Sequence, residues 1–263
     1  MASDALTAFL STPLWVFMTV LARIGPVLIL TPPTRSSGVP NRVRAGLAIA
    51  MAVMVTPTAM PAARPMPADM INLILGLAGE VLLGMIIGCV VLLSVSAIQL
   101  SGQAIGHLAG FDVADALDPN MDETMSILAT LLGWLAIALL LIMGGHRQLF
   151  ECCLDSYQAF PAGGVVPQNS WLQDCDELIR NMLRIGIRAA APIGTALLLA
   201  NLLTGLIART LPQLSVLAVG FNINAMLLLM LLMVSLGSVA WVFQSELASW
   251  FQQCRHIISE RDW

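Results

Sequence analysis

Six long apolar segments set the strongest limit on how this chain can fold. They lie at about residues 5–30, 43–60, 70–105, 125–143, 183–207 and 214–243. A helix that crosses a bilayer needs roughly 20 apolar residues, so each segment is a plausible membrane helix. The third and the sixth are longer, which favours tilt, a kink or an extension beyond the bilayer. The sequence therefore predicts an all-α integral membrane protein of about six long helices.

Composition supports the membrane location and excludes a nucleic-acid surface. Of the 263 residues, 58% are hydrophobic and only 11% are charged, whereas soluble chains are roughly 45–50% apolar and about 25% charged. A soluble domain of this length still leaves roughly a quarter of its chain surface in water, so one core could not hide the excess. All twelve basic residues are arginines and the net charge is -4. This balance is too small and too mixed to bind DNA or RNA.

Proline and glycine stand at the connections between the apolar segments, where helices must stop. The longest polar stretch runs from His146 to Asp176. Its part from Arg147 to Phe160 is expected to form a short interfacial helix with Tyr157 and Phe160 at the apolar edge. We expect a single membrane domain over residues 1–263, in which an N-terminal part, 1–170, contains a loop at 106–123. A C-terminal helix pair occupies 171–263.

Arginine placement gives a partial prediction of orientation. Arg35, Arg42 and Arg44 lie in the first loop, and an excess of basic residues marks cytoplasmic loops. The chain is therefore expected to begin on the outer side. If successive helices cross the membrane in alternating directions, the loop at 107–123 should also be cytoplasmic. That loop is acidic and has no arginine, so its charge conflicts with this simple topology. Either one segment is a re-entrant hairpin, or the helices do not cross the membrane conventionally.

Two ionisable residues, Arg23 and Glu80, lie inside apolar segments. One charge at the bilayer centre costs about 2.5–3.5 kcal/mol on insertion scales, so such groups face protein or a water-filled cavity. They could belong to an ion or proton pathway, or form a structural ion pair or a polar contact to a partner subunit. A proton relay would need more carboxylates in the apolar segments, and only Glu246 is a further candidate. The structural interpretation is favoured.

Small residues recur at four-residue spacing, as Gly84 and Gly88 and again as Gly102 and Gly106. Small side chains on one helix face let helix backbones approach closely, which matters because lipid provides no hydrophobic drive for helices to associate. These glycines are predicted to be helix-packing positions.

No arrangement of residues points to catalysis or to a cofactor. The three histidines are far apart, and no serine-hydrolase, zinc-protease or phosphate-loop motif is present. The five cysteines show no CxxC spacing and are interpreted as small core residues rather than as disulfides or metal ligands. The sequence predicts no enzyme, no cofactor and no metal site.

Short stretches along nearly the whole chain, in the right order, resemble the FliR family of flagellar export-gate proteins and its injectisome relatives. Those stretches are Arg23-Ile24-Gly25-Pro26, Val39-Pro40-Asn41-Arg42, Gly79-Glu80, Ala109-Gly110-Phe111, Leu117-Asp118-Pro119, Gly144-Gly145-His146, Phe160-Pro161-Ala162-Gly163, Ala190-Ala191-Pro192 and Ala208-Arg209-Thr210-Leu211-Pro212-Gln213. The Gly-Gly-His piece is more flagellar than injectisome-like. The chain departs from the family at Gly220-Phe221-Asn222, where a Gly-Phe-Pro turn is usual.

The resemblance implies a structural and gating subunit of the type III flagellar export gate. It implies FliP-like and FliQ-like partners in the bacterial inner membrane at the flagellar basal body, in contact with lipid. Together these subunits form the entry pore for unfolded export substrates. It also implies helices arranged as hairpins. A FliR-like subunit lends a loop to the plug that closes the pore.

The matching plug-like loop here has Phe111 as the apolar stopper. Gly110 permits bending, and the acidic side chains keep the remainder hydrated. The candidate loop residues are Gly110, Phe111, Asp112, Asp115, Asp118 and Pro119. An ordinary acidic surface loop is the alternative.

Two other functions remain open from the sequence. A small-solute or ion transporter would use Arg23 and Glu80 as a site near the bilayer midplane. A membrane enzyme would need paired carboxylates or histidines on facing helices, for which only the acidic loop at 112–123 offers candidates.

Overall fold

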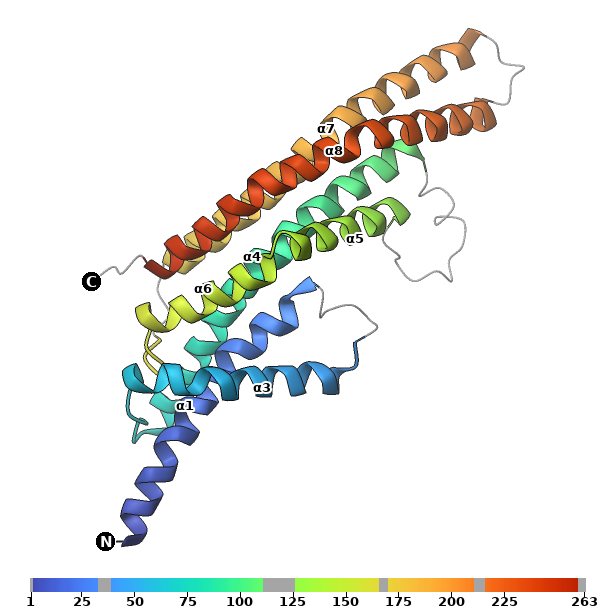
Figure 1. Ribbon diagram of the computed structural model, residues 1–263. Helices are drawn as coiled ribbons and strands as arrows, with labels where there is room; N and C mark the ends of the chain where they lie inside the picture. The colour runs from blue at the N-terminus through green and yellow to red at the C-terminus, as the bar shows by residue number, and fades with distance from the viewer. Residues whose placement is uncertain (1, 33–38, 111–125, 166–169, 211–215, 260–263) are drawn as a thin grey trace. The chain divides into compact units, whose positions relative to one another are not determined.

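The computed structural model describes residues 2–32, 39–110, 126–165, 170–210 and 216–259 (Figure 1). Within these ranges the chain forms α-helices and one short 3₁₀ helix. The elements are α1 (Ala2–Leu30), α3 (Asn41–Ala59), η1 (Met60–Ala62), α4 (Met70–Ala109), α5 (Ile127–Ile142), α6 (Gly145–Ala159), α7 (Ser170–Thr210) and α8 (Val216–Ser259). The predicted all-α class is confirmed.

The helices have the length and composition of membrane spans. Four described helical stretches are long and apolar enough to cross a bilayer, and the count rises to six if each of two bent helix pairs is one span. The four are Thr12–Leu30, Asn41–Ala62, Met70–Ala109 and Trp171–Ile207. Over the described residues, each of the six apolar segments corresponds mainly to one helix, and the expected short helix after Arg147 is α6.

Two helices extend well beyond their apolar segments. α7 begins at Ser170 and α8 continues to Ser259, although hydropathy predicted 183–207 and 214–243. The added turns are amphipathic. Trp171 and Leu178 are buried near the start of α7, as are Trp250 and Cys254 near the end of α8, while polar neighbours face outward. Hydropathy averaged over a sequence window does not detect an amphipathic helix, because its apolar residues recur with a period of 3.6 residues and are averaged with the polar ones.

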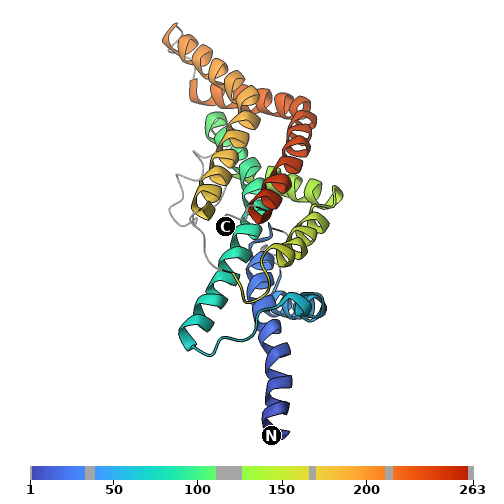
Figure 2. The ribbon, with the colours of Figure 1, turned by 90° about the vertical axis from the view of Figure 1, so that its left-hand side faces the viewer.

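The chain divides into two compact units. Unit 1 contains Met1–Leu93, Gly144–Leu178 and Ala248–Trp263. In it α1 packs against α3 and against the first half of α4, where Gly88 contacts Val27 and Leu30. Figure 2 gives the second view of the same helices. The division of the chain at residue 170 that the sequence suggested stays a prediction.

Unit 2 contains Ser94–Met143 and Ile179–Leu247. Its core is a cluster of buried apolar side chains from α4, α5, α7 and α8: Ile105, Ala109, Leu128, Ala190, Ile193, Leu197 and Leu228. Gly102 lets α4 approach α5, since a Cβ there would lie 2.6 Å from Cα of Ala129. Gly186 lets α7 approach α4 at the Ala97 carbonyl. A side chain larger than hydrogen at either glycine would meet the facing helix, and the assignment of Gly102 as a helix-packing position stays a prediction. Gly106 is also buried.

Candidate functional site

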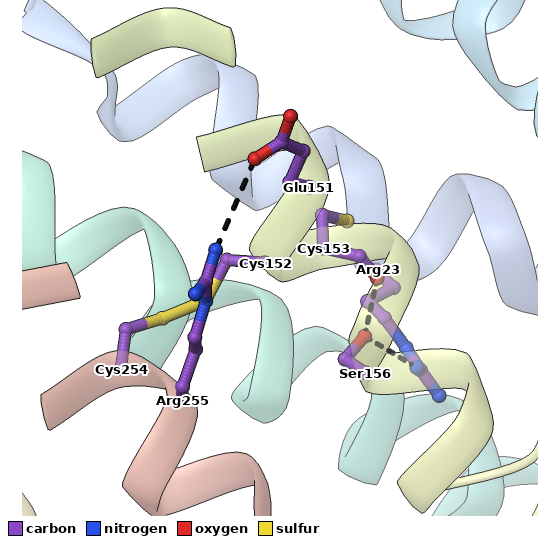
Figure 3. The surroundings of a disulfide bond; sticks show 7 residues. All are labelled: Arg23, Glu151, Cys152, Cys153, Ser156, Cys254 and Arg255. Atoms are coloured by element: carbon purple, nitrogen blue, oxygen red, sulfur yellow. Dashed lines mark hydrogen bonds and ion pairs between the residues drawn. A yellow bond between two sulfur atoms is a disulfide. The ribbon is translucent and has the colours of Figure 1, made fainter. Parts of the chain in front are cut away.

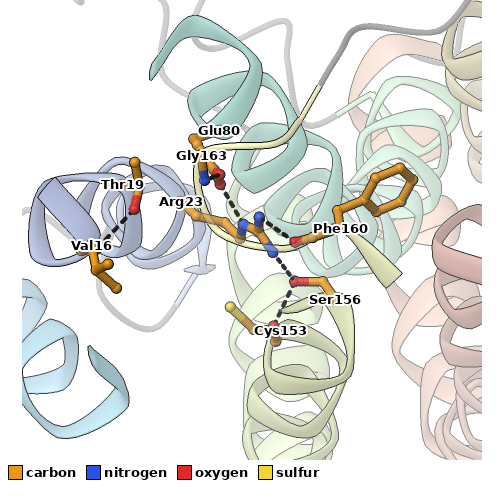
Figure 4. Close-up of polar contacts among 8 residues, drawn as sticks. All are labelled: Val16, Thr19, Arg23, Glu80, Cys153, Ser156, Phe160 and Gly163. Carbon is orange, nitrogen blue, oxygen red and sulfur yellow. Dashed lines mark hydrogen bonds and ion pairs between the residues drawn. The ribbon is translucent and has the colours of Figure 1, made fainter. Parts of the chain in front are cut away.

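Arg23 of α1 and Glu80 of α4 form an ion pair inside unit 1 (Figure 4). Arg23 Nε donates a hydrogen bond of 2.6 Å to Oε2 of Glu80. Both side chains have 0% exposure. The structure therefore brings together, in one buried ion pair, the two charges that the sequence places in apolar segments.

The other groups of this pair also have partners. Arg23 Nη1 donates to Ser156 Oγ (2.8 Å), and Nη2 donates to the Phe160 carbonyl (2.9 Å). The Arg23 guanidinium lies 4.0 Å from the centre of the Tyr157 ring. The backbone N–H of Gly163 donates to Glu80 Oε1 (2.8 Å). A buried ion pair offsets its desolvation only when additional hydrogen bonds satisfy its remaining atoms, and these four contacts meet that condition. We call these six residues the Arg23 network.

The end of α6 is shaped to hold this network. Phe160 leaves the helix with extended backbone angles, which turns its carbonyl toward Arg23. Gly163 then adopts φ +78°, a left-handed conformation that glycine takes without a Cβ penalty. Ser156 both accepts from Arg23 and donates 2.6 Å to the Cys153 carbonyl. The end of α6 thus presents the Ser156 hydroxyl and the Phe160 carbonyl to the same guanidinium.

Two glycines of α4 permit the close approach around Glu80. A Cβ at Gly84 would collide with the carbonyl oxygen of Arg23. A Cβ at Gly79 would lie 2.5 Å from the carbonyl oxygen of Val165. Since backbone atoms cannot rotate away, these positions require glycine for α1 and the 160–165 turn to reach α4. Gly84 and Gly88 were predicted as packing positions; the role of Gly79 was not foreseen.

The partners of Arg23 outside α4 were also missed. Tyr157 and Phe160 were assigned to the apolar edge of an interfacial helix, but their Arg23 contacts lie more than 130 residues away along the chain. Neither Ser156 nor Gly163 was predicted to contact Arg23, and Gly163 was noted only as part of the Phe160-Pro161-Ala162-Gly163 stretch. The one available signal was Arg23 itself, because a buried guanidinium needs several hydrogen-bond acceptors and Glu80 alone cannot supply them all.

One groove among the described residues of unit 1 is lined almost entirely by apolar side chains. This groove of about 570 Å³ lies between α1 and the start of α4. Its lining is apolar and includes neither Arg23 nor Glu80: Leu14, Trp15, Met18, Leu21, Ala22, Met66, Leu73, Leu77 and Val81. A transporter site needs polar groups that converge on the solute, and this groove supplies none.

Unit 2 has a polar network of its own. Asn201 Nδ2 donates to the Leu108 carbonyl (2.9 Å), and Asn224 Nδ2 donates to Asn201 Oδ1 (2.5 Å). The Leu108 carbonyl is among the last four of α4, which have no partner within the helix. Asn201 therefore satisfies one carbonyl at the end of α4, and its bond from Asn224 extends this connection from α7 to α8.

The interpretation of all five cysteines as small core residues is wrong for two of them. Cys152 of α6 and Cys254 of α8 form a disulfide (Figure 3). Cys153 is a buried free thiol, as expected. Disulfide connectivity cannot be deduced from sequence spacing, and these two positions are 102 residues apart.

Most of the expected plug-like loop lies outside the described residues. Phe111, Asp112, Asp115, Asp118 and Pro119 fall in the range 111–125. Gly110 is described and has φ +82°, a conformation that favours glycine where α4 ends. The gating role of these residues stays a prediction.

In the described part of the chain no group of three or more His, Cys, Asp or Glu residues could hold a metal ion. Together, the spans and the Arg23 network define a multi-pass helical membrane protein whose intramembrane charges are engaged within the chain.

Comparison with known proteins identifies the family. The model of bacterial export proteins, family 1, matches residues 14–250, and the chain belongs to this FliR family of export proteins. The flagellar biosynthetic protein FliR of Caulobacter vibrioides is 28% identical over 85% of this chain and 89% of its own length. FliR of Pectobacterium carotovorum subsp. carotovorum is 31% identical over 80% and 78%. The Yop proteins translocation protein T of Yersinia pestis is 27% identical over 73% and 74%. Proteins of this family act in flagellar biosynthesis and type III translocation.

Proposed function

We propose that this protein is a structural and gating subunit of the type III flagellar export gate in the bacterial inner membrane. In this role it assembles with FliP-like and FliQ-like subunits at the flagellar basal body. Together they form the membrane entry pore for unfolded export substrates. The chain contributes packing surfaces and a pore loop, and it performs no catalysis. Family membership supports the export role, and the flagellar names of two compared relatives favour the flagellar system.

The observation that carries the subunit role is the apolar surface of unit 2. On α7 and α8, large apolar side chains are 51–82% exposed: Leu198, Leu199, Leu202, Leu203, Leu206, Met226, Leu229, Met230, Met233 and Val234. Exposed apolar helix faces of this kind can be covered by lipid or by the helices of neighbouring subunits in an assembly. Long helices with this much uncovered surface suit a subunit that packs against several others.

The Arg23 network argues against the transporter alternative. Both carboxylate oxygens of Glu80 and all three guanidinium nitrogens of Arg23 already have hydrogen-bond partners inside the chain. A solute or proton carrier would need one of these atoms to be available to water. We therefore assign the network to the architecture of the subunit.

Co-purification tests the proposed function. The tagged chain is co-expressed with its FliP-like and FliQ-like neighbours, extracted in detergent and analysed by mass spectrometry. We expect a stable oligomer that contains all three kinds of chain. A stable, monodisperse chain without partners would overturn the subunit role.

A matched pair of variants locates the assembly surface. Leu202→Arg places a charge on the exposed apolar face of α7, which costs about 2.5–3.5 kcal/mol at membrane depth, and it should lower the yield of the oligomer at least tenfold. Gln173→Arg lies on the exposed polar part of the same helix and should leave the yield unchanged. Immunoblots of membranes provide the control for insertion of both variants. Equal oligomer yields from two equally inserted variants would exclude this face.

The plug-like loop makes a second prediction. Deletion of residues 111–118 removes Phe111 and three acidic residues, and the assembled gate should then leak ions. The measurement is ion conductance or growth sensitivity in cells that carry the co-expressed assembly. A substitution that keeps the apolar stopper, Phe111→Leu, serves as the control and should leak little. An intact assembly with the deletion and no leak would assign the seal to another segment.

A further inference from the structure

The apolar groove of unit 1 is elongated along two membrane spans. Its walls come from residues 14–22 of α1 and 73–81 of α4, so it extends for about 12 Å along each helix at a rise of 1.5 Å per residue. The two helices run parallel here, since Gly76 lies near the Trp15 ring and Gly84 lies beside a residue two turns further along α1. The groove therefore follows the direction in which both helices cross the membrane.

The groove lies at membrane depth and has an exposed rim. Thr12–Leu30 and Met70–Ala109 are both long and apolar enough to be spans, and the walls of the groove lie within them. Leu14 and Met18 on its rim are 58% and 45% exposed, whereas Trp15 is buried. Because an apolar cavity stays dry, a hydrocarbon group is the occupant that suits it.

One arginine lies at the level where this groove reaches the membrane surface. Arg64 belongs to the linker at 63–69, which joins the spans Asn41–Ala62 and Met70–Ala109. The hydrocarbon core is roughly 30 Å thick, and the headgroup regions bring the bilayer to roughly 40–45 Å. A short linker between two spans therefore lies among the headgroups. Met66 of the same linker lines the groove.

The turn after α6 holds Arg64 beside the groove. The Arg64 backbone N–H donates to the Ala162 carbonyl (2.9 Å). Its side chain lies across Gly164, where an added Cβ would be 2.7 Å from Arg64 Nε. The neighbouring Gly163 lies against the indole of Trp15, which lines the groove. Both the backbone and the side chain of Arg64 are thus positioned near the end of the groove.

The guanidinium of Arg64 is available to a ligand. Arg64 is exposed, and within the described ranges its side chain has no hydrogen bond or ion pair. The carboxylate of the same linker, Asp69, accepts a hydrogen bond from Asn72 Nδ2 (3.2 Å). A guanidinium binds phosphate through paired N–H donors. A phosphate at headgroup level is therefore the ligand that complements Arg64.

The size of the groove favours a lipid chain over a partner helix. An α-helix with its side chains is about 10–12 Å wide, so a length of about 12 Å would occupy roughly 900–1,400 Å³. The groove holds about 570 Å³. A helix would rest on the exposed rim, whereas one acyl chain fits inside.

We propose that this groove and Arg64 form a binding site for one phospholipid of the surrounding membrane. Arg64 donates hydrogen bonds to the phosphate, and one acyl chain lies in the groove between α1 and α4. The lipid covers the apolar walls and completes the packing of α1 on α4 beside the Arg23 network. The site depends on the membrane location of the chain and needs neither a FliP-like nor a FliQ-like subunit.

Native mass spectrometry of the full chain tests the site. The chain is purified in mild detergent, alone or released from its oligomer, and titrated with dioleoylphosphatidylglycerol. We expect one phospholipid per chain to stay bound at collision energies that remove the others. Arg64→Gln removes the cation and Met18→Trp fills the groove, so each should lower the bound fraction at least fivefold.

Matched variants control for charge and for bulk. Arg147→Gln changes an arginine of α6 whose side chain is 80% exposed, and Met54→Trp changes a methionine of α3 that is 77% exposed. Neither residue lines the groove, so both variants should bind lipid as the unchanged chain does. Undiminished binding by Arg64→Gln would overturn the headgroup contact, and undiminished binding by Met18→Trp would overturn the groove as the chain site.

A photocrosslink distinguishes the lipid from a partner helix without any filling variant. A benzophenone amino acid in place of Met18 should label phospholipid when intact membranes are illuminated. A crosslink to a FliP-like or FliQ-like chain instead would assign the groove to a partner and overturn the proposal. Lipid binding is measured on this chain itself, so it can succeed when co-purification fails, and the two failures are distinguishable.

Discussion

Arg23→Met is expected to destabilise the protein by about 3–5 kcal/mol, because it leaves the Glu80 carboxylate buried without its cation. The variant also removes the donors to Ser156 and Phe160, so the end of α6 loses its connection to α1. The measurement is thermal unfolding of the detergent-extracted protein, with or without its partners. The amount of intact chain in membranes should fall as well.

A double replacement distinguishes the charge from the packing. Glu80→Gln added to Arg23→Met removes the unpaired charge and keeps an acceptor for the Gly163 N–H. The double variant should recover a large part of the lost stability, since replacing both members of a buried pair is often tolerated. Arg23→Lys should be intermediate, because one ammonium cannot reach three acceptors in a fixed fork. A double variant no more stable than Arg23→Met would mean that the loss comes from packing rather than from the bare carboxylate.

Gly84→Ala is expected to cost about 1–3 kcal/mol, the typical penalty for overpacking. The added Cβ meets the Arg23 carbonyl oxygen of α1, and a backbone atom can move only if the whole helix moves. α1 and α4 would separate, and the Arg23–Glu80 hydrogen bond would lengthen with them. Thermal unfolding in detergent measures the loss of stability. This loss should be larger for Gly84→Val, because valine adds more atoms at the same contact.

Gly46→Ala is the matched control. Gly46 lies within α3, between its first turn and its centre, and a Cβ there meets nothing within 4 Å. Alanine is favoured over glycine within a helix by about 1 kcal/mol, so this variant should be neutral or slightly more stable. If Gly84→Ala behaved like Gly46→Ala, the α1–α4 approach would be looser than the structure shows.

The helices were largely predictable because apolar length is a local property. The segments at 70–105 and 125–143 correspond closely to α4 and α5. The extension of α7 back to Ser170 was not predicted, since its first turns are polar on one face and become helical by packing Trp171 and Leu178 into unit 1.

The candidate site was predictable only in part. Arg23 and Glu80 stood out because a charge in an apolar segment is costly wherever it lies. Their partners did not stand out, since Ser156 and the Phe160 carbonyl are ordinary groups until a turn of the chain brings them to Arg23. The same holds for Cys152 and Cys254, which became a disulfide only through the approach of α8 to α6.

The sequence by itself determined that this chain is a membrane protein built of helices and which charges must be shielded. These properties follow from the free energy of transferring each side chain between water and lipid, and from the regular spacing of side chains along a helix. Only the tertiary structure decided how the shielding is done, through an α6 turn 137 residues from Arg23 and a disulfide across 102 residues. Such contacts form only when particular helix faces pack together. That packing depends on the whole chain, so no local sequence pattern predicts it.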